Sequence, residues 1–168
     1  MASCDVLTII TGATRGLGQA MAEQLLAQPQ AGVLHIARHA SEPLAQAAAA
    51  QGASLWQWQA DLADAQPVAA QLAQWLGEQQ GPWGEIRLIN NAAVQAEQIA
   101  PVAMTAASSL RQVLRVDLEA PMLLTAAFLQ ATEASAAQGL VRKVLNISSG
   151  LARLAVASMA PYSAAKAG

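Results

Sequence analysis

The stretch VLTIITGATRGLG, residues 6–18, decides the fold because it joins an apolar run to a glycine turn and the start of a helix. The run from Val6 to Ile10 is typical of a strand buried on both faces. Glycines follow at positions 12, 16 and 18, and an apolar helical pattern begins at Leu17. Glycine permits a sharp turn and close approach of an anion, which the free N–H groups of the next helix hold. A plain tight turn also fits these glycines, but their position favours nucleotide binding.

The composition limits the class of protein. The chain has 168 residues, of which 54% are apolar and 12% charged, so it suits one folded domain with a sizeable core. A net charge of −2 without blocks of like charge gives no indication of nucleic acid or a membrane surface as partner. Two histidines and the single Cys4 leave little for a metal site and no internal disulfide. Because there is no room for a signal segment and no apolar run of ~20 residues, we expect a cytoplasmic protein.

Strands and helices alternate along the rest of the chain. Further strands are predicted at 33–37, 55–58, 86–89 and 141–147, and helices at 17–28, 41–51, 64–80 and 105–137. Gly81, Pro82 and Gly84 are expected to break the chain, and Pro121 to kink or interrupt the long helix. The apolar stripe of that helix comprises Leu110, Val113, Leu114, Leu124 and Phe128. The alternation predicts an α/β doubly wound parallel sheet (a Rossmann fold) in the order 3-2-1-4-5, with its ligand where the order reverses.

The residues after the second strand indicate which nicotinamide cofactor fits such a sheet. An acidic residue about 20 positions beyond the glycines holds the ribose of NAD. Here Ala37-Arg38-His39 occupies that place, and the first carboxylate is Glu42. Arg38 can bind a 2′-phosphate through two parallel N–H bonds, and Arg15 adds a cation within the glycine turn. Either arginine alone fits a solvated surface side chain, but the two together favour NADP(H) over NAD(H).

Three residues near the C-terminal end carry the expected chemistry. Tyr162 and Lys166 are four apart, so they share one face of a helix. An ammonium about 4 Å from a phenol favours the phenolate by about 4 kcal/mol and lowers the phenol pKa from about 10 toward neutrality, where general acids work best. Ser149 follows the fifth strand, at the ligand end of the sheet. The Tyr-x-x-x-Lys spacing alone is common in helices. Ser149 also fits a serine that forms a turn or caps a helix, and this is the preferred interpretation of Ser148.

Four ordered motifs resemble those of the short-chain dehydrogenase/reductase family: TGATRGLG at 11–18, Asn90-Asn91-Ala92, the ISS serine at 149, and Tyr-x-x-x-Lys at 162–166. The resemblance implies that Tyr162 protonates the substrate carbonyl oxygen while NADPH delivers hydride. It implies that Ser149 holds that oxygen, and that Lys166 binds the nicotinamide ribose and lowers the pKa of Tyr162. Asp61 resembles the family aspartate beside the adenine, but equally fits a helix N-cap. The implied cofactor-binding residues are Gly12, Thr14, Arg15, Gly16, Leu17, Gly18, Arg38, Asp61, Leu62, Asn91, Ala92, Tyr162 and Lys166.

The sequence departs from the family pattern at three places. The usual asparagine of the long helix corresponds to Asp117, a fourth catalytic candidate, whose carboxylate lies within the apolar stripe and must be hydrogen-bonded or face the site. Ala93 replaces a glycine. The chain ends at Gly168, two residues after Lys166, where family members continue with further strands and the substrate loop. We therefore expect residues 1–168 to form a single NADP(H)-binding domain that binds NADPH weakly and turns over slowly or not at all.

The expected activity is NADPH-dependent reduction of a small-molecule carbonyl. The segments LEAPMLLTAAFLQ (118–130) and RKVLNISSGLAR (142–153) are similar to sepiapterin-reductase-like and benzil-reductase-like members, which implies a ketone or diketone. The resemblance also implies a homodimer or tetramer built on the helix at 105–137 and the next helix. Two alternatives remain open: another activity of the family, such as 3-oxoacyl or sugar-alcohol dehydrogenation, and a catalytically silent NADP(H)-binding module.

Overall fold

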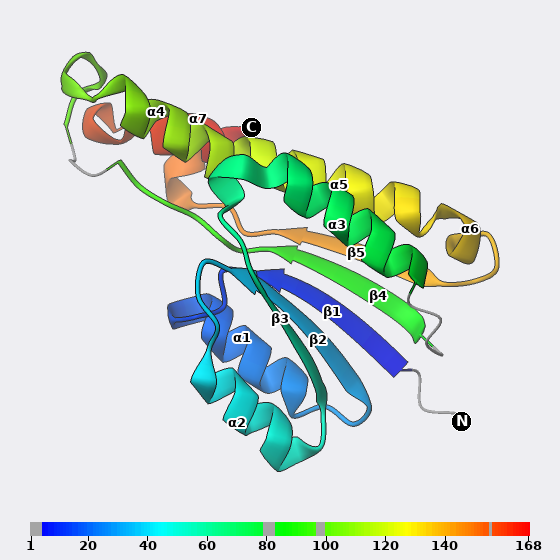
Figure 1. The fold of residues 1–168 in the computed structure, drawn as a ribbon. Coiled ribbons are helices and arrows are strands. Elements are labelled where there is room, and N and C mark those ends of the chain that lie inside the picture. Colours follow the sequence, from blue (N-terminus) through cyan, green and yellow to red (C-terminus); the bar gives the residue numbers. More distant parts are fainter. Residues whose placement is uncertain (1–4, 79–82, 97–99, 155) are drawn as a thin grey trace.

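The computed structural model describes residues 5–78, 83–96, 100–154 and 156–168, so Cys4, Gly81 and Pro82 lie outside the described residues. Its centre is one parallel sheet in the order β3-β2-β1-β4-β5 (Figure 1), which confirms the predicted order. The strands are β1 Asp5–Thr11, β2 Ala31–Ala37, β3 Ser54–Gln59, β4 Trp83–Asn90 and β5 Val141–Asn146.

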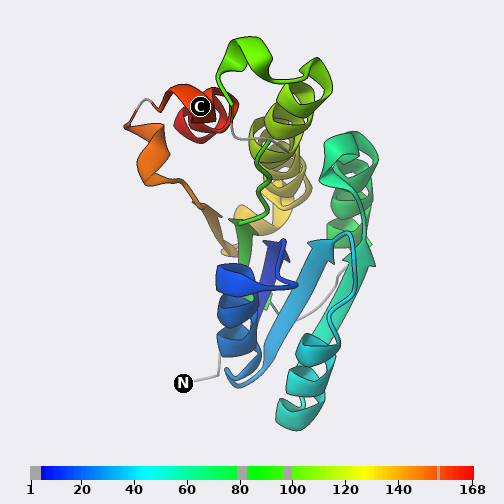
Figure 2. The same cartoon turned by 90° about the vertical axis from the view of Figure 1, so that its left-hand side faces the viewer.

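Helices cover both faces of the sheet (Figures 1 and 2). One face packs against α1 Gly16–Leu26 and α2 Glu42–Gln51, through a core that includes Ile10, Val33 and Leu44. The other packs against α3 Ala65–Glu78 and α5 Ala120–Ala131, through Ile9, Leu72 and Phe128. The remaining helices are α4 Ala107–Leu114, α6 Glu133–Ala136 and α7 Ala160–Ala167. No helix among the described residues is long and apolar enough to cross a membrane.

Gly84 lies inside β4, so the prediction that it breaks the chain was wrong. Asp5 pairs with Trp83 and Val6 pairs with Glu85, which leaves Gly84 as the extra residue of a β-bulge. Glycine within a strand commonly marks such a bulge, because it tolerates the local change of twist at little cost. The strand therefore begins three residues earlier than its apolar run, Ile86–Ile89, indicated.

The helix predicted at 105–137 is interrupted, as Pro121 suggested. Helix α4 passes into a π-helical turn at Arg115–Glu119, where the N–H of Ala120 bonds to the carbonyl of Arg115, and α5 and α6 follow. Pro121 has no N–H for the carbonyl of residue 117, and its ring crowds that carbonyl, so a wider turn is accommodated there.

The apolar stripe of this helix is narrower than predicted. Val113, Leu124 and Phe128 are buried and Leu110 is half-buried, but Leu114 is 41% exposed. Leu114 lies about 100° around the helix from Val113, so it falls outside the face that meets the sheet.

Candidate active site

The turn between β1 and α1 has a backbone that glycine adopts freely. Gly12 and Gly16 have φ values of +69° and +59°, a region that is costly for residues with a Cβ. A Cβ on Gly18 would lie 2.5 Å from the carbonyl oxygen of Gly12 and 3.1 Å from the Cα of Ala13. Helix α1 therefore packs directly against the turn, and its first N–H groups have no side-chain cap.

Asn91, which directly follows the neighbouring strand β4, holds this turn. Its Nδ2 donates to the carbonyl oxygens of Thr11 and Gly12, each at 3.0 Å. The Oγ1 of Thr11 accepts in return from the N–H groups of Asn91 and Ala92, both at 3.0 Å. Because β1 and β4 are parallel neighbours, these four bonds fix their carboxyl ends against each other.

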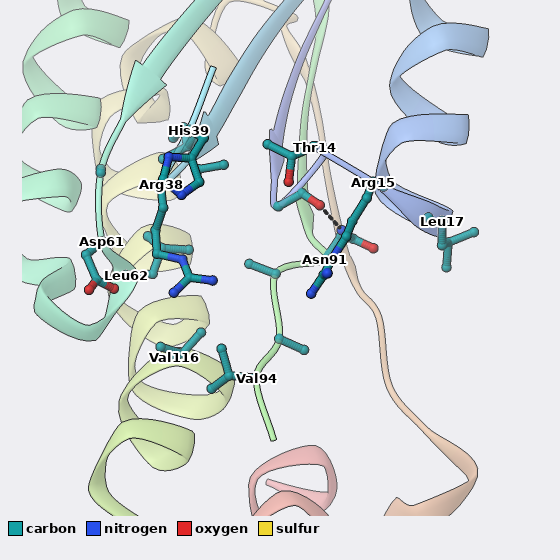
Figure 3. A pocket seen from close by; sticks show the side chains of 18 of the residues that line it. Thr14, Arg15, Leu17, Arg38, His39, Asp61, Leu62, Asn91, Val94 and Val116 are labelled. Atoms are coloured by element: carbon teal, nitrogen blue, oxygen red, sulfur yellow. Dashed lines mark hydrogen bonds between the residues drawn. The ribbon is translucent and has the colours of Figure 1, made fainter. Parts of the chain in front are cut away.

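A pocket of about 620 Å³ opens beside the turn, at the carboxyl ends of β1, β2, β3 and β4 (Figure 3). Every predicted cofactor residue except Tyr162 and Lys166 lines it: Gly12, Thr14, Arg15, Gly16, Leu17, Gly18, Arg38, Asp61, Leu62, Asn91 and Ala92. They come together because the strand order reverses at β1, so the loops that follow β1 and β4 diverge to opposite faces of the sheet.

Two cations reach into the pocket from different elements. Figure 3 shows Arg15 extending from the glycine turn and Arg38 from the end of β2 toward the same space. Neither guanidinium forms an ion pair within the described part of the chain. Asp61 lines the pocket while its Oδ1 accepts from the N–H of Ala63 at 2.9 Å, so the N-cap interpretation holds. Charge and space together suit an anionic, elongated ligand.

Part of the pocket wall was not predicted. It consists of Ile36, Ala37, His39, Ala60, Ala93, Val94, Gln112 and Val116. Most of these residues end a strand or follow one, and position at the carboxyl end of the sheet would have indicated them. Gln112 and Val116 belong to α4 and the π-helical turn, where no motif marks a residue as facing a ligand.

Helix α7 places Tyr162 and Lys166 on one face, as their spacing predicts. The Nζ of Lys166 lies 5.8 Å from the centroid of the Tyr162 ring and donates to the carbonyl of Ile147 at 3.2 Å. The Oγ of Ser148 donates to the carbonyl of Lys166 at 3.2 Å. These bonds attach the last turn of α7 to the loop after β5.

Ser149 lies in that loop and caps a short 3₁₀ helix, Gly150–Ala152. Its Oγ accepts from the N–H of Leu151 at 3.2 Å, and the residue is half-buried. A hydroxyl has one proton and two acceptor sites, so accepting this bond leaves its proton available. The cap interpretation is therefore observed, and it remains compatible with the predicted role toward a carbonyl oxygen.

Asp117 is buried in the π-helical turn, where it meets two other elements. Its Oδ1 accepts from the N–H of Val94 at 2.8 Å, which confirms that the carboxylate is hydrogen-bonded. Its Oδ2 lies 3.9 Å from the Nζ of Lys166 and has no hydrogen-bond partner among the described residues. Burial raises the pKa of Asp117 to about 6, against the opposing effects of the Val94 hydrogen bond and the charge of Lys166.

Asp117 and Lys166 line a second cavity of about 570 Å³, bounded by α5, β5 and α7. At its floor the Nδ2 of Asn90 donates to Thr125 Oγ1 at 3.1 Å and to Asn146 Oδ1 at 2.8 Å. Asn90 thus joins β4 to α5 and β5. Asp117 and Lys166 therefore line a different cavity from the other cofactor-binding candidates, whereas Ser149 and Tyr162 line neither of these two cavities.

The chain is similar to known proteins in sequence and in fold. The chain matches the family model of the short chain dehydrogenases over residues 7–168. It is 29% identical over 161 residues to a benzil reductase ((S)-benzoin forming) of Bacillus cereus, covering 95% of this chain but 63% of that reductase. A short-chain dehydrogenase/reductase structure from Burkholderia vietnamiensis is 36% identical with a TM-score of 0.83, covering 99% of this chain and 73% of the other. A metagenomic short-chain oxidoreductase in complex with NADP is 28% identical with a TM-score of 0.82, over 97% and 70%.

The matched residues span the glycine turn, the Asn90–Ala92 segment, Ser149 and the Tyr162–Lys166 pair. Fold, motif order and family model agree over nearly the whole chain. The protein is a member of the short-chain dehydrogenase/reductase family of oxidoreductases.

Proposed function

We propose that this protein reduces a ketone or diketone carbonyl with NADPH. The preference for NADPH rests on Arg15 and Arg38, which line the pocket and form no ion pair within the described part of the chain. In addition, no carboxylate directly follows β2. A related oxidoreductase binds NADP, and another relative is a benzil reductase. We include in the proposal a cytoplasmic location and self-association through 105–137, where Leu114 and Met122 are exposed.

The residues present fit a nicotinamide dinucleotide. Uncapped N–H groups at the start of α1 suit a pyrophosphate. A Cβ at Gly12 would lie 2.8 Å from the Cα of Ala92, so glycine is needed where the turn meets the loop after β4. Arg38 suits a 2′-phosphate, because a guanidinium binds phosphate oxygens in pairs.

A nicotinamide cofactor held by the glycine turn and Arg38 would supply the hydride for the carbonyl carbon. Tyr162 then donates its phenolic proton to the carbonyl oxygen, while the hydroxyl of Ser149 hydrogen-bonds to that oxygen. Lys166, held by the carbonyl of Ile147, lies with its Nζ 5.8 Å from the centroid of the Tyr162 ring. Asp117 in turn holds the loop after β4 through Val94 and lies beside Lys166.

Tyr162→Phe tests the reaction. The variant removes the proton donor but keeps the ring, so it should lose roughly 100-fold or more in the reduction rate of benzil while its affinity for NADPH stays within about twofold. NADPH fluorescence measures both. A variant that reduces benzil as fast as the wild type contradicts the catalytic assignment, and NADPH binding without reduction by the wild type supports the binding-only alternative.

Arg38→Ala tests the cofactor. Loss of a charge-assisted hydrogen-bond pair should weaken NADPH binding by roughly 10- to 100-fold. NADH, which lacks the 2′-phosphate, should bind the variant about as well as the wild type. The matched control is Arg153→Ala, an exposed arginine outside the pocket lining. Equal losses for both nucleotides would contradict the placement of a 2′-phosphate at Arg38.

A further inference from the structure

A histidine in the middle of the sheet bonds to the glycine turn. His35, on β2, is completely buried, and its Nε2 accepts from the N–H of Ala13 at 3.1 Å. The turn has a second bond to the same strand, from the N–H of Gly12 to the carbonyl of Ile36 at 2.9 Å. The His35 bond is a side-chain bond, so it depends on the identity of residue 35.

The other ring nitrogen bonds to β3. His35 pairs with Gln57 in the parallel register, and its Nδ1 lies 3.3 Å from the Oε1 of Gln57. The same Oε1 accepts from the N–H of Ser41 at 2.6 Å, and the Nε2 of Gln57 donates to the carbonyl of Ser41 at 3.2 Å. Gln57 therefore forms hydrogen bonds with both the N–H and the carbonyl of Ser41, the N-cap residue of α2.

These partners determine the tautomer of the imidazole. An amide oxygen cannot donate, so Nδ1 carries the proton and Nε2 keeps the lone pair that accepts from Ala13. Burial lowers the pKa of His35, while the Gln57 hydrogen bond acts in the opposite direction. The lowered pKa favours the neutral imidazole, which can donate to Gln57 and accept from Ala13 at the same time. A chain of side-chain bonds thus runs from Ala13 through His35 and Gln57 to Ser41.

This series of hydrogen bonds begins and ends beside the two parts of the pocket proposed to bind phosphate, the glycine turn and the Arg38 segment. Ala13 lies in the glycine turn, which is next to the pyrophosphate in the proposed complex. At the other end, the segment 38–40 carries Arg38 and is exposed. On its N-terminal side, the segment is anchored by the hydrogen bond from the Ala60 N–H to the Ala37 carbonyl at 2.9 Å. On its C-terminal side, it is anchored by the two hydrogen bonds between Gln57 and Ser41.

We propose that His35 and Gln57 are positioning residues for the cofactor, His35 for the glycine turn and Gln57 for the Arg38 segment. This inference rests on the proposed binding of NADPH in the pocket. It predicts separate roles for the buried His35 and the half-buried Gln57, neither of which lines the pocket. His35 acts on the pyrophosphate, which NADPH and NADH share, whereas Gln57 acts on the 2′-phosphate, which only NADPH has.

Binding of NADPH and NADH to four variants of the protein tests this division. His35→Phe keeps a ring but no acceptor, so it should weaken both nucleotides by a similar factor, about 3- to 10-fold. His35→Gln can still accept from Ala13 and donate to Gln57, so it should restore both affinities to within about twofold. Gln57→Leu should weaken NADPH by about 3- to 10-fold and NADH by less than about twofold. Gln59→Leu, an exposed neighbour on β3, is the control and should change neither.

A spectroscopic signature separates positioning from a general loss of structure. In ¹⁵N-labelled protein, a coupling across the hydrogen bond should connect the Ala13 amide nitrogen with the His35 Nε2. It should persist in Gln59→Leu and disappear in His35→Phe, with far-UV circular dichroism unchanged. If His35→Phe does not fold, His35→Gln and Gln57→Leu still decide the matter.

The outcomes separate this inference from the function on which it rests. Wild-type protein that binds no NADPH overturns the proposed function, and the inference with it. Wild-type binding, together with Gln57→Leu weakening both nucleotides equally or neither, overturns the inference alone.

Discussion

Strands β2 and β5 belong to one sheet but have different surroundings. All seven residues of β2 are buried, whereas no residue of β5 is, and Val141, Val144 and Leu145 are exposed. β2 lies between two strands and beneath helices on both faces, while β5 is the last strand of the described sheet. The cofactor candidates depend on the first region and the acid–base candidates on the second.

The two regions also hold their functional residues differently. Around β1 and β2, backbone and side-chain bonds from Asn91, Thr11 and His35 fix the glycine turn. Near β5, the Lys166 side chain donates to the carbonyl of Ile147 and lies 3.9 Å from Asp117, and its backbone carbonyl accepts from Ser148. The cofactor-binding candidates therefore depend on the covered centre of the sheet, whereas the acid–base candidates depend on its edge.

One pair of identical substitutions tests this difference most strongly. Leu34→Ala in β2 removes a side chain with no exposed surface and should lower the free energy of unfolding by about 2–5 kcal/mol. Leu145→Ala in β5 removes a side chain that is 49% exposed and should cost less than about 1 kcal/mol. Urea unfolding measures both. If both variants lose the same free energy of unfolding, another surface covers β5 in solution, and the contrast between β2 and β5 is contradicted.

Asp117 should make the edge region sensitive to pH. Its carboxyl has a pKa of about 6 in the folded protein against 3.8 ordinarily. Between these values the folded state binds more protons than the unfolded state, so the free energy of unfolding falls as pH rises through this window. By pH 7 the cost amounts to about 3 kcal/mol.

Asp117→Asn should remove that cost and keep an acceptor for Val94. The variant should therefore be more stable than the wild type at pH 7, by up to about 3 kcal/mol, with the difference vanishing near pH 4. Urea unfolding from pH 4 to 8 measures this, with Glu119→Gln, an exposed carboxylate of the same turn, as control. A stability difference that is independent of pH would contradict the assignment.

Gly18→Ala should destabilise the protein less than Leu34→Ala and should also cause a local loss of function. Its Cβ would approach the Gly12 carbonyl to 2.5 Å, so the turn must shift, at a cost of about 1–3 kcal/mol. NADPH affinity should fall as well. Gly77→Ala in α3, where a Cβ meets nothing within 4 Å, should instead stabilise by about 0.5–1 kcal/mol. Thermal unfolding and NADPH titration compare the two, and unchanged NADPH affinity in Gly18→Ala would argue against a ligand on this turn.

The alternation of strands and helices along the chain was enough to predict the strand order. The glycine turn and the helix that carries Tyr162 and Lys166 depend on local information, namely glycines at fixed spacing after an apolar run and two residues four apart on a helix. The same local information predicted that Pro121 would disturb the long helix and that Asp117 would need a partner.

The identity of those hydrogen-bond partners became apparent only from the tertiary structure. Asp117 meets Val94 and Lys166, and His35 connects Ala13 to Gln57, across separations of 22 residues or more. The bulge at Gly84 likewise depends on pairing with β1 rather than on its own segment. Hydrogen bonds of this kind follow from which elements pack together, and a buried polar group takes whichever partner that packing places beside it.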